Sequence, residues 1–487
     1  MASHQTIVVE LGSSRIKVGF AGESKPRRVL DDDGIDGAAR HGGCAGWTVG
    51  VNDGMVSRAC KWTSLFRYSS YMSASSSSNT SHDEGNDGST SAFTTAYEWE
   101  RTLYPLFSHI LTSILFIQRP PRHRMLLMIS DSFPPRIFHE ALHRVLLDYL
   151  NVGSVWLLNG GAFEGAYHLL EGLPPPPPSI PPSSGPPRAH LLVDIGTQES
   201  RVVVSVAGSS ILPDTHRATA SGYNSFLCQV LANYRERITT DDEVDEGAQL
   251  ERDESESPVT SLEDANAVVR AFIALSSSPA GLSSESTTIQ VRLPSLERAR
   301  QTNASMGDMV QLPIQPLLEA FYQIYLDFSN PMSLIFAMLA SVMSCPIDYR
   351  KAAMQHSVLL GGGSVALRHF RFPRGPASMG NSANGLCRQL EVAARDACGV
   401  SSDESMDESK EKEEKKDDGT SSMSSIAKKR FQSLGGAVNG YVNDAGDRIG
   451  GINIQYPDPF AADTFAWVGG SIMGTLGYSQ YYQNKFP

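Results

Sequence analysis

The sequence has few cysteines, and none of them is spaced for metal binding. Its six cysteines are scattered along 487 residues without a Cys-x-x-Cys pair. Structural zinc sites usually need such pairs, and disulfide frameworks are typical of short secreted chains. We therefore expect reduced thiols, with neither a zinc centre nor a disulfide framework.

An excess of basic residues and long apolar runs are also missing. Lys and Arg number 41 against 53 Asp and Glu, which gives a formal net charge of -12. Nucleic-acid binders need a concentrated basic face, so no nucleic-acid partner is predicted. The longest apolar run, 334–343, is too short to cross a bilayer core of about 30 Å. The start of the chain, 1–5, lacks the pattern of a signal peptide. We expect no membrane partner and a cytoplasmic location.

The length suffices for two domains of about 100–200 residues each with their own cores. Patterned blocks alternate with segments poor in apolar residues, which we interpret as disordered insertions or linkers. These segments are a Ser/Gly-rich stretch at 31–92, a Pro-rich linker at 173–189, an acidic stretch at 239–260 and a mixed-charge stretch at 399–425.

The most informative feature is an internal repeat. Residues 7–13 match 191–197, because each has an apolar run, an acid, an apolar residue, Gly, and then Ser or Thr. A second β-like run follows each, at 15–20 and 201–206. Short β-branched runs bounded by Gly are typical of buried strands, and a tight turn makes each pair a hairpin. The repeat predicts a duplicated α/β architecture with a cleft between its halves.

The turns of these hairpins have the chemistry of phosphate loops. The backbone N–H groups of Gly12, Ser13 and Ser14 are predicted to point at a phosphate, because Gly allows close approach. Lys17 would add a point charge.

The acids that precede the turns suggest a metal. Glu10 and Asp194 are predicted to face each other across the cleft and to hold Mg²⁺ through water molecules. Buried strands often end in an acidic turn without any ligand, so for either hairpin alone the structural interpretation is favoured, and the pair together is the stronger signal.

Five motifs, in order along the chain, resemble those of actins. Residues 10–22 look like the first phosphate loop, 193–197 like the second, and 359–364 like the adenosine loop. The segment 345–351 precedes the adenosine loop as in actins. The C-terminal Trp-Val-Gly-Gly-Ser-Ile at 467–472 is the most specific match. The sequence therefore resembles the actin-related protein family.

The resemblance implies an actin-like fold of two duplicated lobes around a nucleotide cleft. The first lobe would span 1–172, the second 190–451, and 452–487 would return to the first. ATP or ADP with Mg²⁺ is the implied cofactor. Beside the residues of the first turn, the implied contacts are Asp194, Gly196, Thr197, Gly361 and Gly362.

Departures from the actin pattern affect hydrolysis. Thr197 stands where actins have a second acid, Arg201 where they have His, and Gly160 where they have Gln. Positioning of water and electrostatics dominate phosphoryl transfer, so we expect no enzyme activity. Arg201 is expected to reach a terminal phosphate and to favour nucleotide retention. Further departures, at positions that contact the nucleotide in actins, are Asn266, Ala267 and Ala366.

One branch of the family matches best. The helix–strand–helix–strand pattern over 106–158, with 345–351, is similar to the subunit that closes the pointed end of dynactin's minifilament. The implied partners are the actin-related filament subunit and the other dynactin pointed-end subunits, and the implied location is the cytoskeleton. A nuclear subunit of a chromatin-remodelling complex and a polymerising actin-like ATPase remain alternatives.

Single residues outside the loops have structural interpretations. We expect Trp467 to pack in a core between helix and sheet, and Cys345 to be a buried apolar residue. Arg350 and Lys351 are expected to be a solvated helix start or, alternatively, interface charges. His139 and His143 have metal-ligand spacing but no acid partner, so no metal is predicted there.

Overall fold

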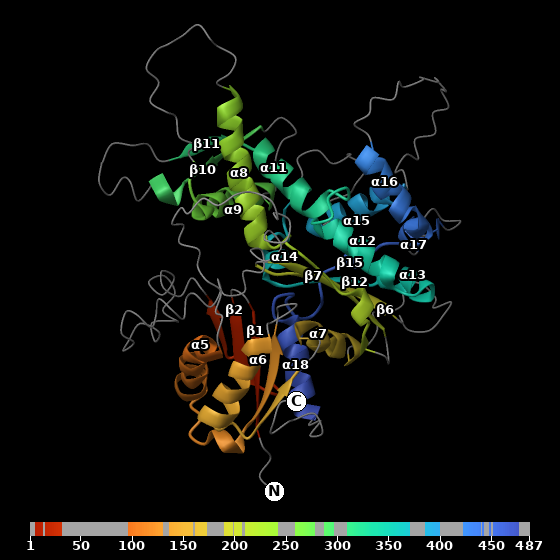
Figure 1. The fold of residues 1–487 in the computed structure, drawn as a ribbon. Helices are drawn as coiled ribbons and strands as arrows, with labels where there is room; N and C mark the ends of the chain where they lie inside the picture. Colours follow the sequence, from red (N-terminus) through yellow and green to blue (C-terminus); the bar gives the residue numbers. More distant parts are fainter. Residues whose placement is uncertain are drawn as a thin grey trace, which may run out of the picture. The chain divides into compact units, whose positions relative to one another are not determined.

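The computed structural model describes residues 5–12, 15–31, 96–129, 136–158, 161–172, 189–197, 199–206, 210–241, 259–277, 287–296, 309–370, 385–399, 422–439, 441–442, 448–449 and 451–476 (Figure 1). The chain divides into two compact units. The first comprises Met1–Pro182 and Asp458–Pro487, and the second comprises Ser183–Pro457.

A mixed five-stranded sheet forms the centre of the first unit, in the order β3-β2-β1-β4-β5. The strands are β1 (Thr6–Leu11), β2 (Arg15–Phe20), β3 (Arg28–Asp31), β4 (Arg124–Ile129) and β5 (Ser154–Leu157). The first three strands pair antiparallel, and β4 and β5 continue the sheet in parallel. β1 is buried along its whole length, as expected of a strand with both faces covered.

Helices cover both faces of this sheet. They are α5 (Ala96–His109) with η2 (Ile110–Ile114), the short η3 (Pro120–Arg122), α6 (Arg136–His143) with η4 (Arg144–Tyr149), α7 (Gly161–Gly172) and α18 (Phe465–Leu476). Side chains alternate between the two faces of a strand. Ile7 and Val9 accordingly share a core with Trp99 and Phe138 of the α5–α6 layer, whereas a Cβ on Gly474 of α18 would touch Val8.

Two glycines explain the C-terminal Trp-Val-Gly-Gly-Ser-Ile motif. α18 packs against α7 and β1, and a Cβ on Gly469 would overlap the carbonyl oxygen of Gly165 in α7. Only a residue without a side chain permits this approach. Trp467 is fully buried, and its Nε1 donates to Val8 O over 3.4 Å. The core interpretation of Trp467 is confirmed.

The second unit contains a mixed sheet in the order β15-β12-β6-β7-β8, with β9 also paired to β7. Its strands are β6 (Ala189–Ile195), β7 (Ser200–Val206), β8 (Ser210–Ile211), β9 (Arg217–Thr219), β12 (Ser357–Leu360) and β15 (Ile454–Gln455). Two small antiparallel ribbons accompany it, β10 (Thr288–Val291) with β11 (Val310–Pro313), and β13 (Tyr441–Val442) with β14 (Arg448–Ile449).

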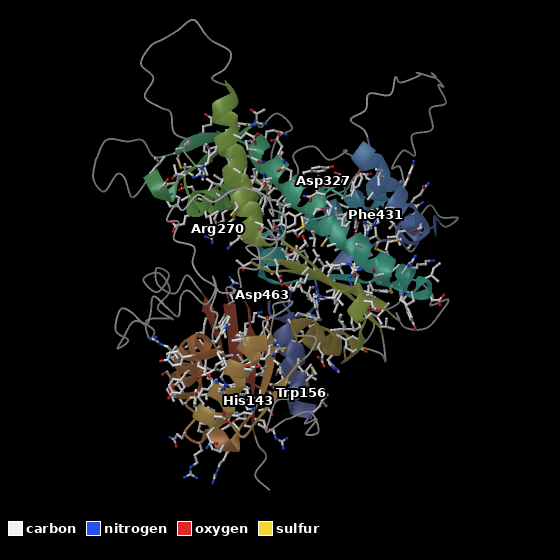
Figure 2. All side chains as sticks on the ribbon, in the orientation of Figure 1. His143, Trp156, Arg270, Asp327, Phe431 and Asp463 are labelled. Carbon is white, nitrogen blue, oxygen red and sulfur yellow. The ribbon has the colours of Figure 1, made fainter. Side chains whose placement is uncertain are left out.

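Helices of the second unit enclose an aromatic core. They are η5 (Pro213–Thr215), α8 (Tyr223–Asp241), α9 (Leu262–Ser277), α11 (Gln315–Phe321), η7 (Tyr322–Leu326), α12 (Leu334–Ser344), α13 (Ile347–Gln355), α14 (Gly362–Ala366), α15 (Gly385–Ala397), α16 (Ser422–Phe431), η8 (Gln432–Leu434) and α17 (Gly435–Asn439). Phe321 and Phe370 stack with ring centroids 4.0 Å apart, and Phe226 meets both edge-on. Phe431, labelled in Figure 2, is fully buried at the end of α16.

The predicted α/β class with mixed sheets is confirmed, and so are both hairpins, β1–β2 and β6–β7. None of the helices in the described ranges is long and apolar enough to span a membrane. The C-terminal segment was predicted to return to the first lobe from residue 452. Instead, β15 at 454–455 still pairs with β12 of the second unit, and the first unit resumes at Asp458.

The edges of two predicted insertions were wrong. α8 extends to Asp241, Val259 is fully buried, and α16 begins at Ser422. The acidic composition had suggested that this stretch is disordered, but Val259 is buried in the core of the second unit. The remainder of these insertions, residues 32–92 and residues 173–188 lie outside the described residues.

Candidate functional site

The first hairpin holds a buried ion pair across its two strands. Glu10 and Lys17 are directly opposite each other in the β1–β2 register. Lys17 Nζ lies 2.5 Å from Glu10 Oε1, and both residues are buried, with 6% of their surface exposed. The turn is closed by the Gly12 N–H, which donates to Arg15 O over 2.9 Å. Ser13 and Ser14 lie outside the described residues.

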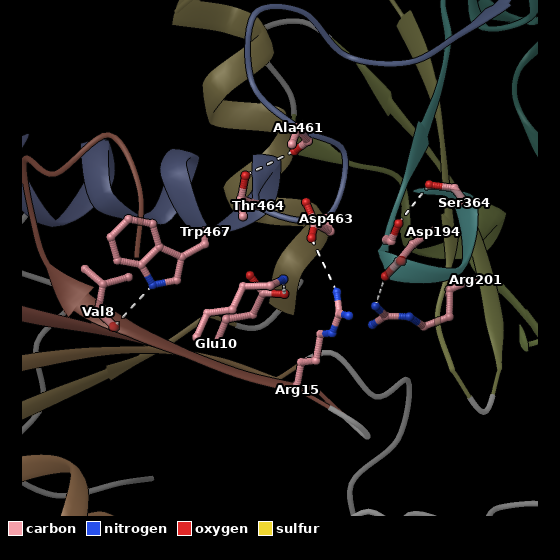
Figure 3. Close-up of polar contacts among 12 residues, drawn as sticks. Val8, Glu10, Arg15, Asp194, Arg201, Ser364, Ala461, Asp463, Thr464 and Trp467 are labelled. Carbon is pink, nitrogen blue, oxygen red and sulfur yellow. Dashed lines mark hydrogen bonds and ion pairs between the residues drawn. The ribbon is translucent and has the colours of Figure 1, made fainter. Parts of the chain in front are cut away.

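The second hairpin repeats this arrangement with different side chains. Asp194 is opposite Arg201 in the β6–β7 register, and Arg201 Nη2 donates to Asp194 Oδ2 (Figure 3). Arg201 Nε lies 3.8 Å from a second carboxylate oxygen, Glu199 Oε1. The Gly196 N–H closes the turn on Glu199 O over 3.0 Å, as Gly12 does in the first hairpin.

The structure gives Arg201 a different partner from the predicted one. We expected its guanidinium to reach a terminal phosphate, but it is 3% exposed and pairs with Asp194 of its own hairpin. The signal was present in the sequence. In both hairpins Gly follows the acid by two positions and the cation follows it by seven, which places acid and cation opposite each other across a tight turn.

The predicted adenosine loop lies directly against the second hairpin. β12 pairs with β6 so that Leu360 is opposite Asp194. Gly361 follows with φ 89°, and a Cβ there would overlap Asp194 Oδ1. Ser364 Oγ donates to Gly361 O over 2.8 Å (Figure 3). The structure therefore brings Asp194, Gly196, Gly361 and the N-terminal Gly362 of α14 together within the second unit.

Helix α8 begins on the same turn. The Tyr223 N–H donates to Gly196 O over 3.0 Å, and the Asn224 N–H donates to Thr197 O over 2.8 Å. Tyr223 also donates its hydroxyl proton to Asn266 Oδ1 of α9 over 2.9 Å. Burial raises the pKa of Tyr223 to about 12, so this hydroxyl stays protonated at neutral pH. Asn266, predicted from the family pattern to be near the nucleotide, is thus connected to the second turn.

The carboxylates do not fit a magnesium site within either unit. Mg²⁺ prefers oxygen ligands whose charge is available to it, but Glu10 and Asp194 each face a buried cation of their own hairpin. In the part of the chain that the structure describes, no three His, Cys, Asp or Glu residues cluster in a way that would hold a metal. The prediction that the Gly12 N–H points at a phosphate was wrong, because Gly12, like Gly196, donates its N–H within its own turn. The adjacent loop of Gly361 remains compatible with a phosphate, and nucleotide binding stays a prediction.

Other predicted residues have mixed outcomes. Cys345 is buried, as expected, and burial raises the pKa of its thiol to about 11. Ala366 ends α14, and Ala267 is a partly buried residue packed on the main core. Gly160 lies outside the described residues.

The interpretation of Arg350 as a solvated charge was wrong. Its Nε donates to Cys345 O over 2.9 Å, and its Nη2 donates to Met343 O over 2.8 Å. The last carbonyls of a helix have no partner within the helix, and a basic side chain in the next helix satisfies them here. Arg350 therefore caps the C-terminus of α12.

No protein-family model and no curated protein matches this chain. The proposal below therefore depends on the motifs and on the geometry of the two hairpins.

Proposed function

We propose that the protein is a non-catalytic actin-related structural subunit with two actin-like lobes. It would close the pointed end of the dynactin minifilament beside the actin-related filament subunit and the other pointed-end subunits, and so support dynein-driven transport. The repeated hairpin supports the family proposal, because each unit has one such hairpin among the central strands of a mixed sheet. The loop of Gly361 against the second hairpin is where the actin pattern has its adenosine loop.

The observation that carries the non-catalytic part is the buried pair of Arg201 and Asp194. An actin-like site needs this carboxylate to organise the water shell of a metal, and an imidazole near the attacking water. Here a permanently charged guanidinium takes the carboxylate instead. Thr197 offers no second carboxylate. The hairpin thus retains its backbone while its ionisable groups neutralise one another.

Purification of the tagged protein with its partners tests the cytoskeletal proposal. We expect dynactin pointed-end subunits and the actin-related filament subunit to copurify in stoichiometric amounts. Copurification of helicase-type chromatin-remodelling subunits would contradict the proposal and favour the nuclear alternative. No described contact favours that alternative.

Phosphate release and light scattering of the purified protein test the second part. We expect background turnover and no filaments, since several groups that act on the same water or metal shell are replaced. Arg201→His or Gly160→Gln alone should leave turnover near background, whereas adding Thr197→Asp to both should raise it. Actin-like turnover or self-assembly of the unmodified protein would overturn the proposal and favour the polymerising ATPase.

A further inference from the structure

Two helices of the first unit end in the same unusual way. Each closes with a π-helical turn, η2 or η4, and the second residue after it has left-handed backbone, with φ 54° at Phe116 and 51° at Asn151. The next residue is buried and donates its N–H six positions back, over 2.7 Å from Ile117 and 2.9 Å from Val152. Among the described residues, these two are the non-glycine residues with positive φ.

The two positions differ in how well their side chains suit that backbone. Gly and Asn are the residues that adopt left-handed conformations most readily, and they commonly terminate helices. A bulky residue there is an outlier. Phe116 is 78% exposed, so burial of its ring does not offset the strain. Asn151 shows that the same helix end forms with a residue suited to it, and no contact among the described residues of the first unit accounts for an aromatic ring at 116.

Exposure alone would carry no inference, because single apolar side chains on surfaces are ordinary. Phe116 is held between two buried residues, Leu115 and Ile117, at 5% and 8% exposure. A short 3-10 turn follows, and its exit is fixed by the Gly153 N–H, which donates to His123 O over 3.1 Å. A Cβ on Gly153 would overlap Pro121 O, so the backbone at Gly153 packs directly against the 3-10 turn. A ring presented by a fixed backbone loses little entropy on binding.

The charged residues next to this ring in the sequence are all basic. Residues 115–124 contain three Arg and one His and no acid, in a chain whose net charge is -12. Arg119 and Arg122 are exposed. An aromatic ring flanked by arginines has the composition of an interface hot spot, since both residue types are enriched there. Complementarity then requires an acidic surface around the partner's apolar pocket.

We propose that Phe116, with Arg119 and Arg122 as its basic flank, is a protein-docking knob that inserts into an apolar pocket with an acidic rim on a partner protein. One ring and a short basic loop provide less apolar area than the amphipathic helices or paired anchors that hold proteins on membranes, so a protein partner is favoured. The proposal does not depend on the pointed-end function.

Subtractive peptide display on the full-length protein tests the knob without a known partner. Peptides that bind the unmodified protein but not Phe116→Asn would be collected, and their affinities measured by calorimetry. We expect sequences that combine Asp or Glu with large apolar residues, and about tenfold or greater loss of affinity in Phe116→Asn. Arg119→Glu with Arg122→Glu should also weaken binding, by lowering the association rate. Failure to recover any peptide sensitive to Phe116 would overturn the proposal.

Thermal unfolding separates docking from folding, and Asn151→Phe is the matched control. Phe116→Asn should melt at the same temperature as the unmodified protein or about 2 °C higher, since it relieves strain. Asn151→Phe should melt lower and bind the selected peptides unchanged. Melting of Phe116→Asn well below the unmodified protein would overturn the proposal by showing that the ring serves the fold. Phe116-dependent binding to vesicles of equal parts phosphatidylserine and phosphatidylcholine would replace the protein partner with a membrane.

Discussion

The two hairpins share one backbone arrangement but differ in the ion pairs that their side chains form. In the first, Glu10 meets Lys17, whose ammonium is a compact point charge on a flexible stem. In the second, Asp194 and Glu199 both lie near the guanidinium of Arg201. The second turn is also in contact with the loop of Gly361 and the start of α8. The same spacing of acid, Gly and cation therefore gives the same hairpin register in both units, whereas the elements packed on each turn differ.

The largest expected effect is the loss of the second ion pair. Arg201→Met leaves Asp194 buried with Glu199 as its charged neighbour, and should lower the free energy of unfolding by about 3–5 kcal/mol. Lys17→Met should cost less, because among the described residues Lys17 pairs with one carboxylate, whereas Arg201 lies near two. Urea denaturation monitored by hydrogen exchange would measure the free energy of unfolding of each unit separately.

A spectroscopic signal and a double variant help to separate the two ion pairs. The tryptophans among the described residues, Trp99, Trp156 and Trp467, are all buried in the first unit, so their fluorescence reports the unfolding of that unit. The double variant Arg201→Met with Asp194→Asn should recover much of the loss, since the buried negative charge is removed with its partner. Equal losses for Arg201→Met and Lys17→Met would show that the two hairpins hold their charges equally well.

The next effect concerns the loop that contacts the second hairpin. Gly361→Ala should destabilise the second unit by about 3 kcal/mol or more, because it adds overlap with Asp194 to a strained backbone. Gly399→Ala is the matched control, since Gly399 has φ 71° but nothing within 4 Å of an added Cβ. It should cost about 1 kcal/mol, the price of the left-handed backbone alone. Similar denaturation midpoints for the two variants would contradict close packing of the loop on the hairpin.

Acid should distinguish the two units by a smaller amount. Burial, with the neighbouring His356, lowers the pKa of His190 to about 4, and burial, with Arg201 and Arg217, lowers that of His216 to about 4. The unfolded chain therefore takes up protons first. Stability is full above the ordinary value of 6.5 and is lost as pH falls toward 4, by at most about 1.4 kcal/mol per pH unit for each His.

Hydrogen exchange at pH 7 and pH 5 would check this prediction. Peptides of the second unit should lose more protection than those of the first, where burial lowers the pKa values of His109 and His139 by less marked amounts. His190→Gln with His216→Gln should flatten the response of the second unit. A response that survives this double substitution would assign the acid sensitivity to other groups.

The smallest effect is expected at the cap of α12. Arg350→Ala removes two hydrogen bonds to helix-end carbonyls and should cost about 1–2 kcal/mol. Lys429→Ala, at an exposed position of α16, should leave stability within about 0.5 kcal/mol. If the two variants unfold at the same urea concentration, Arg350 is a surface charge as the sequence suggested.

The features that could be predicted from the sequence are local ones. Both hairpins were predictable, because β-branched runs and a Gly-closed turn are signals within about fifteen residues. The helix–strand alternation over 106–158 is also present as α5, β4, α6 and β5, for the same reason. The turn residues Gly12 and Gly196 were identified, since tight turns need glycine at fixed positions.

The contacts between these local elements depend on the tertiary fold. The contact of Gly469 with Gly165 joins residues about three hundred positions apart in the chain, and no local pattern reports it. Arg350 looked solvated because its sequence neighbours are polar, yet it faces carbonyls of the preceding helix. Arg201 looked available to a ligand because the sequence showed its charge but not its burial. Burial depends on every element that packs around a residue, and it determines whether a charge stays in water or is paired within the protein.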